Sequence, residues 1–334
     1  MNILVVRKHN QIGDMLCSLP LFKALKKKYP ESSITLVASP TNYPIPFKKI
    51  NPFIDHVLFY DKSSIFTIFK FYKKLREKKY QLGIVPSTVK ISTTSHIINI
   101  LSGANFRVGV KSIDGMKNRT AILLNKSADF YWNKNKVHQK ERNYQIAQLA
   151  GCDFSDDQKD FKLKFAPEDL EFSDLFINNN FPDDKKLIIG FHPGAGELMN
   201  IWNTENFINI IETLYKKHNN YILITCGEID KVVIQIIKEG LNQKGIKFTI
   251  AENLPLLQLA AVLDRINLFI STDTGPMHIA AMTNVKQISL MLPTKVYEWA
   301  PKGENKYYLK SEPGDINTIK IEDVLELSDK ILVG

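Results

Sequence analysis

The sequence is poor in cysteine, with three in 334 residues. Cys17, Cys152 and Cys226 are odd in number and far apart, which argues against a disulfide framework and against a zinc site. No apolar run reaches the roughly 18 residues that a membrane span needs. The apolar stretch at the N-terminus is too short for a signal peptide. These absences predict a protein of the reducing cytoplasm.

Familiar nucleotide-binding signatures are also missing. Gly194-Ala195-Gly196 lacks the third glycine of a dinucleotide fingerprint, because Met199 occupies that position. No Walker motif occurs, and the aromatic motifs of RNA-binding domains are absent. Hydride transfer, P-loop hydrolysis and nucleic-acid binding are therefore disfavoured.

The chain is long and its charge is uneven. A chain of 334 residues exceeds one ordinary core and predicts two domains. Residues 1–165 hold 28 basic and 12 acidic residues, a net charge of +16, whereas residues 166–334 hold 16 and 23, a net charge of −7. The asymmetry suggests that the first half meets an anionic membrane surface, phosphorylated glycolipid or nucleic acid. A lysine-rich surface produced by biased codon usage is the alternative.

Hydrophobic periodicity predicts alternating strands and helices in both halves, which favours parallel α/β sheets with right-handed crossovers. The expected strands cover 3–6, 33–37, 56–60, 82–85 and 106–110, then 187–191, 221–225, 247–251, 268–271 and 287–291. A helix over 14–29 should be kinked at Pro20. Helices are also expected over 204–217, 231–241, 256–263 and 277–282, and a polar linker carrying a helix over 153–186.

The most informative stretch is 271–281, which reads STDTGPMHIAA. It follows a run typical of a buried strand and opens a run typical of a helix, with Pro276 at the first helical position. Free N–H groups and the helix dipole around Thr274 would suit a phosphate or diphosphate. Asp273 and His278 flank that position. The alternative is an ordinary N-cap beside a packed histidine.

Ligands of open parallel sheets bind beyond the carboxyl ends of the strands. Four loops therefore matter, and each should open on the ligand side of its sheet. They are RKHNQIGD at 7–14, HPGAG at 192–196, CGE at 226–228 and the loop around Asp273.

With these loops identified, the chain resembles glycosyltransferase family 9, the ADP-heptose:lipopolysaccharide heptosyltransferases. The resemblance covers nearly the whole length, and the order and spacing of its segments are specific. The matching segments are Gly13-Asp14-Met15-Leu16, His138 with Arg142-Asn143, His192-Pro193-Gly194-Ala195 with Trp202 downstream, Gly227-Glu228, and Asp273-Thr274-Gly275-Pro276-Met277-His278.

The resemblance implies a GT-B fold, in which two Rossmann-like α/β domains with parallel sheets face each other across a cleft. Residues 1–165 would form the acceptor-binding domain and residues 166–315 the nucleotide-sugar-binding domain. The tail, 316–334, is apolar at helical spacing and would be the helix that packs back against the first domain.

The resemblance also implies an inverting transfer of a heptose or related sugar from a nucleoside-diphosphate sugar, expected to be ADP-heptose, to a lipopolysaccharide core acceptor. Asp14 corresponds to the family's proposed general base, with helix capping as the alternative role. No metal or other cofactor is implied. The implied donor-binding residues are Gly194, Ala195, Asn200, Glu228, Asp273, Thr274, Gly275 and His278.

The acceptor is expected on the basic half, which would also draw the enzyme to the inner face of the inner membrane as a peripheral protein. No nucleic-acid partner is expected. The candidate acceptor-binding residues are Lys8, Lys48, Lys49, Arg107, Lys111, Arg119, His138 and Arg142.

Asn200 departs from the family pattern, which has Lys or Arg two residues before the tryptophan, here Trp202. Either another cation such as Lys295 substitutes, or the donor differs, or activity is weak. A different GT-B enzyme, such as an O-antigen or capsule transferase with another sugar nucleotide or acceptor, is therefore the second hypothesis. The third hypothesis is a non-catalytic binder of anionic glycan or nucleic acid. Such a protein would need the basic half but not Asp14, Asp273 and His278 together.

Overall fold

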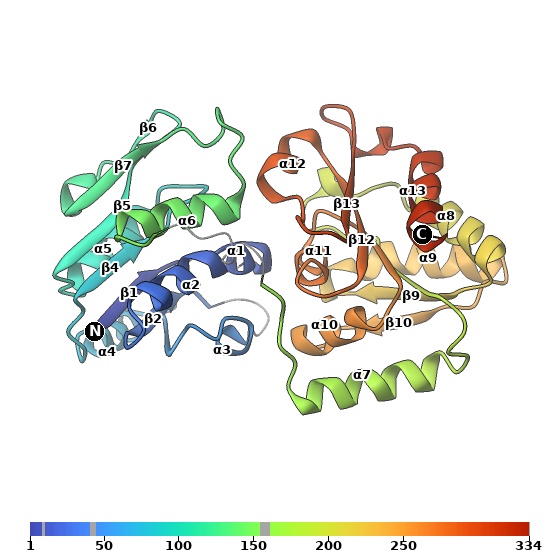
Figure 1. The fold of residues 1–334 in the computed structure, drawn as a ribbon, viewed down its shortest axis with the longest axis horizontal. Coiled ribbons are helices and arrows are strands. Elements are labelled where there is room, and N and C mark those ends of the chain that lie inside the picture. Colours follow the sequence, from blue (N-terminus) through green and yellow to red (C-terminus); the bar gives the residue numbers. More distant parts are fainter. Residues whose placement is uncertain (9–10, 41–44, 154–160, 334) are drawn as a thin grey trace. The chain divides into compact units, whose positions relative to one another are not determined.

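The computed structural model describes residues 1–8, 11–40, 45–153 and 161–333. The chain forms two compact units, Met1–Phe161 and Lys162–Gly334 (Figure 1). The boundary lies a few residues before the predicted one at 165. Each unit is an α/β domain built on its own sheet, as predicted.

The first unit has a sheet in the order β3-β2-β1-β4-β5-β6, with β7 pairing with β5. All of these strands are parallel except β6, which forms an antiparallel hairpin with β5. The strands are β1 (Asn2–Val6), β2 (Ser33–Ala38), β3 (His56–Phe59), β4 (Leu82–Val85), β5 (Phe106–Ile113), β6 (Met116–Lys117) and β7 (Lys126–Phe130). The helices are α1 (Ile12–Cys17), α2 (Leu19–Lys28), α3 (Phe47–Ile50), α4 (Ile65–Leu75), α5 (Thr93–Leu101) and α6 (Gln139–Leu149).

The second unit has a fully parallel sheet in the order β10-β9-β8-β11-β12-β13. Its strands are β8 (Ile188–His192), β9 (Tyr221–Cys226), β10 (Thr249–Glu252), β11 (Leu268–Thr272), β12 (Lys286–Met291) and β13 (Lys306–Lys310). Its helices are α7 (Pro167–Asn180), α8 (Thr204–His218), α9 (Lys231–Gln243), α10 (Leu256–Asp264), α11 (Gly275–Ala280), α12 (Pro293–Trp299) and α13 (Ile321–Val333). The reversal of strand order between β8 and β11 places the loops after these strands at the ligand-binding position of such sheets.

The irregularity predicted at Pro20 is a complete break. The first helix ends at Cys17 and the second begins at Leu19, with Pro20 in its first turn. Ser18 closes the break, because its hydroxyl donates to the carbonyl of Met15 at 2.7 Å. Proline has no N–H to donate to the preceding turn, so one continuous helix would lose a hydrogen bond there.

The C-terminal helix, α13, packs into the core of the second unit. Val324 and Ile331 of α13 are buried in the hydrophobic core of the second unit, together with residues of α8. Asp329 also pairs with Lys217 and His218 at the end of α8, each at 2.7 Å. The apolar face of α13 therefore completes the second core, and its expected packing against the first domain stays a prediction.

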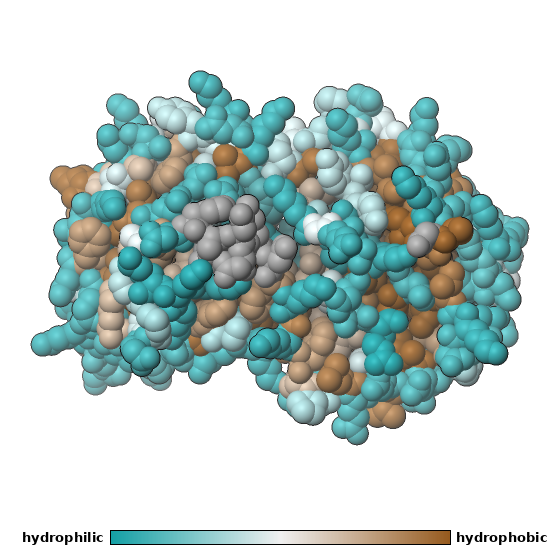
Figure 2. All heavy atoms as spheres, in the orientation of Figure 1, coloured by the Kyte–Doolittle hydropathy of each residue, from teal (hydrophilic) through white to brown (hydrophobic). Residues whose placement is uncertain are grey.

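Hydrophilic side chains predominate on the face shown in Figure 2, with apolar patches between them. None of the helices in the described part of the chain has both the length and the apolar character to span a membrane.

Candidate functional site

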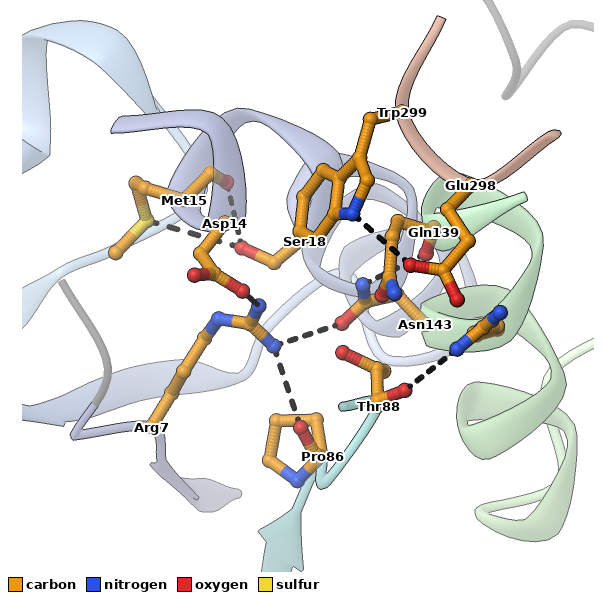
Figure 3. A network of polar contacts seen from close by, with 11 residues as sticks. Arg7, Asp14, Met15, Ser18, Pro86, Thr88, Gln139, Asn143, Glu298 and Trp299 are labelled. Atoms are coloured by element: carbon orange, nitrogen blue, oxygen red, sulfur yellow. Dashed lines mark hydrogen bonds and ion pairs between the residues drawn. The ribbon is translucent and has the colours of Figure 1, made fainter. Parts of the chain in front are cut away.

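The turn from β1 into α1 holds an ion pair that involves the predicted base. Arg7 follows β1 directly, and its Nη2 donates to Oδ1 of Asp14 at 2.8 Å (Figure 3). The two side chains are 4% and 12% exposed, so the pair is screened from bulk water. An ion pair with a buried arginine fixes the orientation of the carboxylate.

Asp14 is not the cap of this helix. The N-cap is Gln11, which makes no side-chain capping bond, and Asp14 lies in the first turn. Within the described residues, no hydrogen bond to the second carboxylate oxygen, Oδ2, is found. The capping alternative is therefore wrong, and one oxygen of Asp14 stays available for chemistry.

Arg7 joins three segments that are distant in the sequence. Its Nη1 donates to Oδ1 of Asn143 on α6 at 3.1 Å and to the carbonyl of Pro86, just after β4, at 3.2 Å (Figure 3). Asn143 in turn donates to the carbonyl of Gln139. Arg7 had no predicted role, and Asn143 was only part of a matching motif. The signal available was the position of Arg7 directly after a buried strand.

Two predicted acceptor residues are fixed within the fold at the start of α6. Arg142 is 2% exposed, and its guanidinium donates to the carbonyls of Thr88 and Val137 and to Oδ1 of Asn133. His138 is the N-cap of α6, and its Nδ1 accepts from the backbone N–H of Lys140 at 3.1 Å. These contacts give both residues a structural role at the carboxyl end of β4.

Arg107 lies away from the predicted site. It pairs in register with Gly83 near the amino end of β4, at the sheet edge opposite to the loop that carries Asp14. Its guanidinium donates to the carbonyls of Ala104 and Leu123, both at 2.7 Å. Ligands bind beyond the carboxyl ends of such strands, so Arg107 lies away from the expected ligand position, and its role in acceptor binding stays a prediction.

The charged groups of the other predicted acceptor residues are at least partly exposed to solvent. Lys8 follows β1 and places Nζ 5.5 Å from the ring centroid of Tyr60. Burial, followed by the charge of Lys62, lowers the pKa of Lys8. Lys111 is exposed and pairs with Asp129 at 3.3 Å. The exposed set is completed by Lys48, Lys49 and Arg119.

In the second unit, β11 leads into α11 as predicted, but groups of the chain itself already accept hydrogen bonds from most N–H groups in the first turn of this helix. Thr274 is the N-cap, and its hydroxyl accepts from the backbone N–H of Met277 at 3.4 Å. The N–H of His278 donates to the carbonyl of Thr274, and Pro276 has no N–H. Gly275 therefore offers the one N–H of this first turn that has no hydrogen bond among the described residues. The capping alternative holds for Thr274, and this helix presents fewer free donors than the sequence led us to expect.

Asp273 and His278 lie together beside α12. Nε2 of His278 is 3.8 Å from Oδ1 of Asp273, and the imidazole packs edge-on against the ring of Trp299. Burial raises the pKa of Asp273 to about 6; the charge of Lys295 opposes this rise, and nearby Glu197 and Glu298 add to it. The carboxyl group of Asp273 therefore changes protonation close to neutral pH.

A buried pair that was not predicted from the sequence, His192 with Asp230, connects the loops after β8 and β9. Nε2 of His192 lies 3.7 Å from Oδ2 of Asp230, and both side chains are at most 5% exposed. Oδ2 of Asp230 also accepts from the N–H of Gly227 at 2.8 Å. Burial lowers the pKa of His192. A Cβ atom on Gly194 would lie 2.0 Å from Oδ1 of Asp230, so glycine is required there.

Gly194 is also tied to the strand that carries the Asp273 loop, because the hydroxyl of Thr272 donates to its carbonyl at 2.9 Å. Ala195 follows it and is half-buried. Glu228 is exposed, pairs with Lys231, and accepts from the amide of Asn253 after β10 at 3.0 Å. Lys231 lowers the pKa of Glu228. The predicted donor residues Gly194, Ala195, Glu228 and Asp273 thus follow the carboxyl ends of the adjacent strands β8, β9 and β11.

Asn200 lies in a short 3₁₀ helix, Leu198–Asn200, and is 4% exposed. Its Oδ1 is buried without a hydrogen-bond partner among the described residues. Trp202 is fully buried, and its indole N–H donates to the carbonyl of Ile319 at 3.2 Å. Within the described parts of the chain, no group of three or more His, Cys, Asp or Glu side chains is arranged to hold a metal ion.

Comparison with known proteins identifies the family of this chain. The model of glycosyltransferase family 9 (heptosyltransferase) matches residues 68–328. The chain belongs to glycosyltransferase family 9. It is therefore a glycosyltransferase, as the sequence predicted.

The relatives of this family-9 chain are distant, and they match different shares of its length. It is 23% identical over 344 residues to lipopolysaccharide heptosyltransferase 3 of Escherichia coli K12, covering 96% of this chain and 95% of the relative. It is 24% identical to lipooligosaccharide heptosyltransferase 2 of Campylobacter jejuni, over 54% of this chain and 55% of the relative.

Among solved structures, the family 9 glycosyl transferase of Veillonella parvula matches with a TM-score of 0.81 at 18% identity, covering 99% and 97% of the two chains. The E. coli ADP-heptose LPS heptosyltransferase II matches with a TM-score of 0.79 at 19% identity, covering 100% and 99%. These likenesses confirm the predicted fold class, GT-B with two parallel-sheet α/β domains.

Proposed function

We propose that this chain transfers a heptose or a closely related sugar from a nucleoside-diphosphate sugar, ADP-heptose, to the core of a lipopolysaccharide, with inversion at the anomeric carbon. The relatives named as lipopolysaccharide heptosyltransferases support the acceptor class. The match to an ADP-heptose LPS heptosyltransferase supports the donor class. The observation that carries the proposal is the ion pair between Arg7 and Asp14 directly after β1.

Asp14 acts as the general base in this proposal. The acceptor hydroxyl attacks the anomeric carbon of the donor, its proton passes to Oδ2 of Asp14, and the bond from that carbon to the diphosphate oxygen breaks. Arg7 occupies Oδ1 and leaves Oδ2 to receive the proton. Because Arg7 also binds Asn143 and Pro86, it acts as a positioning residue that fixes the base against α6 and β4.

The donor lies on the loops of the second unit. The departing nucleoside diphosphate needs positive charge or N–H donors close to its oxygens. Lys295 supplies the cation, because its charge already acts on Asp273. The N–H of Gly275 and the side chain of His278 supply further contacts, and Glu228 holds the ribose. We therefore infer a transfer that uses no metal ion or other cofactor.

The acceptor lies against the basic first unit at the inner face of the inner membrane. The accessible cations that we assign to it are Lys8, Lys48, Lys49, Lys111 and Arg119. Arg107 and Arg142 are left out, because protein carbonyls already engage their guanidinium groups.

A second candidate is a transferase that uses another sugar nucleotide or surface-glycan acceptor. Asn200 favours it, since the buried amide places no positive charge where the family has a basic residue. A scan of nucleotide sugars for thermal stabilisation separates the two, because a ligand at roughly 100 times its Kd adds about 2.7 kcal/mol. We expect ADP-heptose to stabilise the protein most and to label heptose-deficient core lipopolysaccharide. Stabilisation and transfer by a different sugar nucleotide would establish the second candidate instead.

A further inference from the structure

Helix α4 exposes large apolar side chains on the surface of the first unit. Ile65, Phe66 and Phe69 are 77%, 82% and 72% exposed, although side chains of this kind are usually buried. On the opposite side of the same helix, Phe71 and Leu75 are buried in the core. The helix therefore has a second apolar surface that the fold does not use, and such patches mark interaction sites.

The exposed side of α4 is arranged in two rows that each run from apolar to basic. Residues four apart lie one above the other on a helix. One row is Ile65, Phe69 and Lys73, and the other is Phe66, Lys70 and Lys74. The three lysines are exposed, and Ile65–Leu75 contains no acidic residue. The surface formed by these two rows is called the α4 face below.

The α4 face is held in place by contacts at the start of the helix and on its buried side. Ser64 and Thr67 form a reciprocal capping box, with bonds of 3.1 and 3.2 Å. Phe71 packs against Tyr60 with ring centroids 5.0 Å apart. An ordered helix of this kind loses little conformational entropy on docking.

We propose that the α4 face docks on an anionic lipid surface. The phenyl rings enter the boundary between headgroups and acyl chains, as apolar faces of amphipathic helices do. The lysines extend along the surface and place their ammonium groups on lipid phosphates. Docking of a second copy is disfavoured, because two α4 faces would bring six lysines together without an acidic partner. The inference deepens the proposed acceptor side of the function by naming the surface that holds the enzyme at the lipid.

The test measures binding of the full chain to vesicles of phosphatidylcholine alone and of phosphatidylcholine with phosphatidylglycerol, without donor or acceptor. One variant removes the rings and another removes the charges. Each has a control that changes exposed residues elsewhere. The ring variant is Phe66→Ser with Phe69→Ser, and its control is Ile122→Ser with Leu175→Ser. The charge variant is Lys70→Gln, Lys73→Gln and Lys74→Gln, and its control is Lys126→Gln, Lys134→Gln and Lys185→Gln.

We expect the wild-type chain and both controls to bind the anionic vesicles and to bind neutral ones weakly. The ring variant should lose about tenfold or more in partitioning. The charge variant should lose about a hundredfold, since each basic residue near an anionic surface contributes about fivefold. A tryptophan placed by Phe69→Trp should be quenched by brominated lipids in the anionic vesicles only.

Unchanged binding of the ring variant, or equal losses in the ring variant and its control, would overturn the proposal. A concentration-dependent dimer that Phe66→Ser with Phe69→Ser dissociates would overturn it in favour of a second copy. Turnover on a delipidated core oligosaccharide is measured in parallel. If the docking proposal fails, vesicle binding does not depend on the α4 face but turnover on the oligosaccharide is still observed. If the proposed transfer fails, turnover is absent but vesicle binding still depends on the α4 face.

Discussion

Replacing Asp273 by asparagine should stabilise the ligand-free protein at pH 8 and weaken its binding of nucleotide. The side chain of Asp273 is 13% exposed, and burial raises its pKa from 3.8 to about 6. At pH 8 the protein therefore holds a buried charge that the unfolded chain would expose to water. Asparagine has nearly the same shape and no charge, so it removes this cost.

The magnitude and the sign follow from the two pKa values. A difference of about two units corresponds to about 3 kcal/mol, because one unit is 1.36 kcal/mol. The folded state binds the proton more tightly than the unfolded state, so stability falls as pH rises from about 4 to about 6. The Asp273→Asn variant lacks this dependence. Its advantage should be near zero at pH 4, grow between pH 4 and 6, and level off above pH 6 at up to about 3 kcal/mol.

Urea unfolding at several values between pH 4.5 and 8 measures this advantage, and calorimetry with ADP at pH 8 measures the functional cost. Glu304→Gln, at an exposed carboxylate, is the matched control and should leave stability unchanged. A stability advantage of Asp273→Asn that does not vary with pH would contradict the raised pKa of Asp273. A variant that is less stable than wild type at pH 8 would refute it as well.

Two further variants test the donor loops. Gly194→Ala should destabilise the loop after β8 and reduce ADP affinity at least tenfold, because its Cβ atom would overlap the buried carboxylate of Asp230. The control is Gly196→Ala, whose Cβ atom has open space around it. This control should behave like the wild type in thermal melts and calorimetry. Lys295→Ala should reduce ADP affinity by about tenfold or more, the cost of one charge-assisted contact, while the same change at exposed Lys302 should not. Lys295→Ala should also raise the pKa of Asp273 further, which a pH titration of stability would detect.

Alternation of apolar runs predicted nearly all strands of both sheets, but it missed the ones whose burial is weak. β13 reads KYYLK, and Tyr307 and Tyr308 are 36% and 46% exposed. Such an edge strand has no apolar alternation to detect. Periodicity also identified the C-terminal helix correctly, but an amphipathic pattern shows only that one side is buried and not against which domain.

The candidate site could be predicted where its residues are adjacent in the sequence. Asp273 and His278 fall within one loop and one helical turn, so their proximity followed from local geometry. Arg7 and Asp230 could not be assigned, since their roles depend on partners far along the chain. Asn143 is separated from Arg7 by 136 positions. Only the fold brings such residues together.

The role of Asp14 is the claim on which the proposed mechanism depends. Asp14→Asn keeps an oxygen that accepts the hydrogen bond of Arg7, so the fold and ADP affinity should be retained. An amide is not a base, so turnover should fall about 100-fold or more. Glu31→Gln, at an exposed carboxylate of the same unit, is the control and should keep full activity.

The most direct measurement is therefore the transfer of heptose from ADP-heptose to heptose-deficient core lipopolysaccharide. It compares the wild-type, Asp14→Asn and Glu31→Gln proteins. Turnover is followed both as ADP released and as heptose attached to the acceptor. We expect a product whose anomeric configuration is opposite to that of the donor. The wild type and Glu31→Gln should form it at the same rate, and Asp14→Asn about 100-fold more slowly. Near-wild-type turnover by Asp14→Asn, or a product that retains the configuration of the donor, would contradict this expectation.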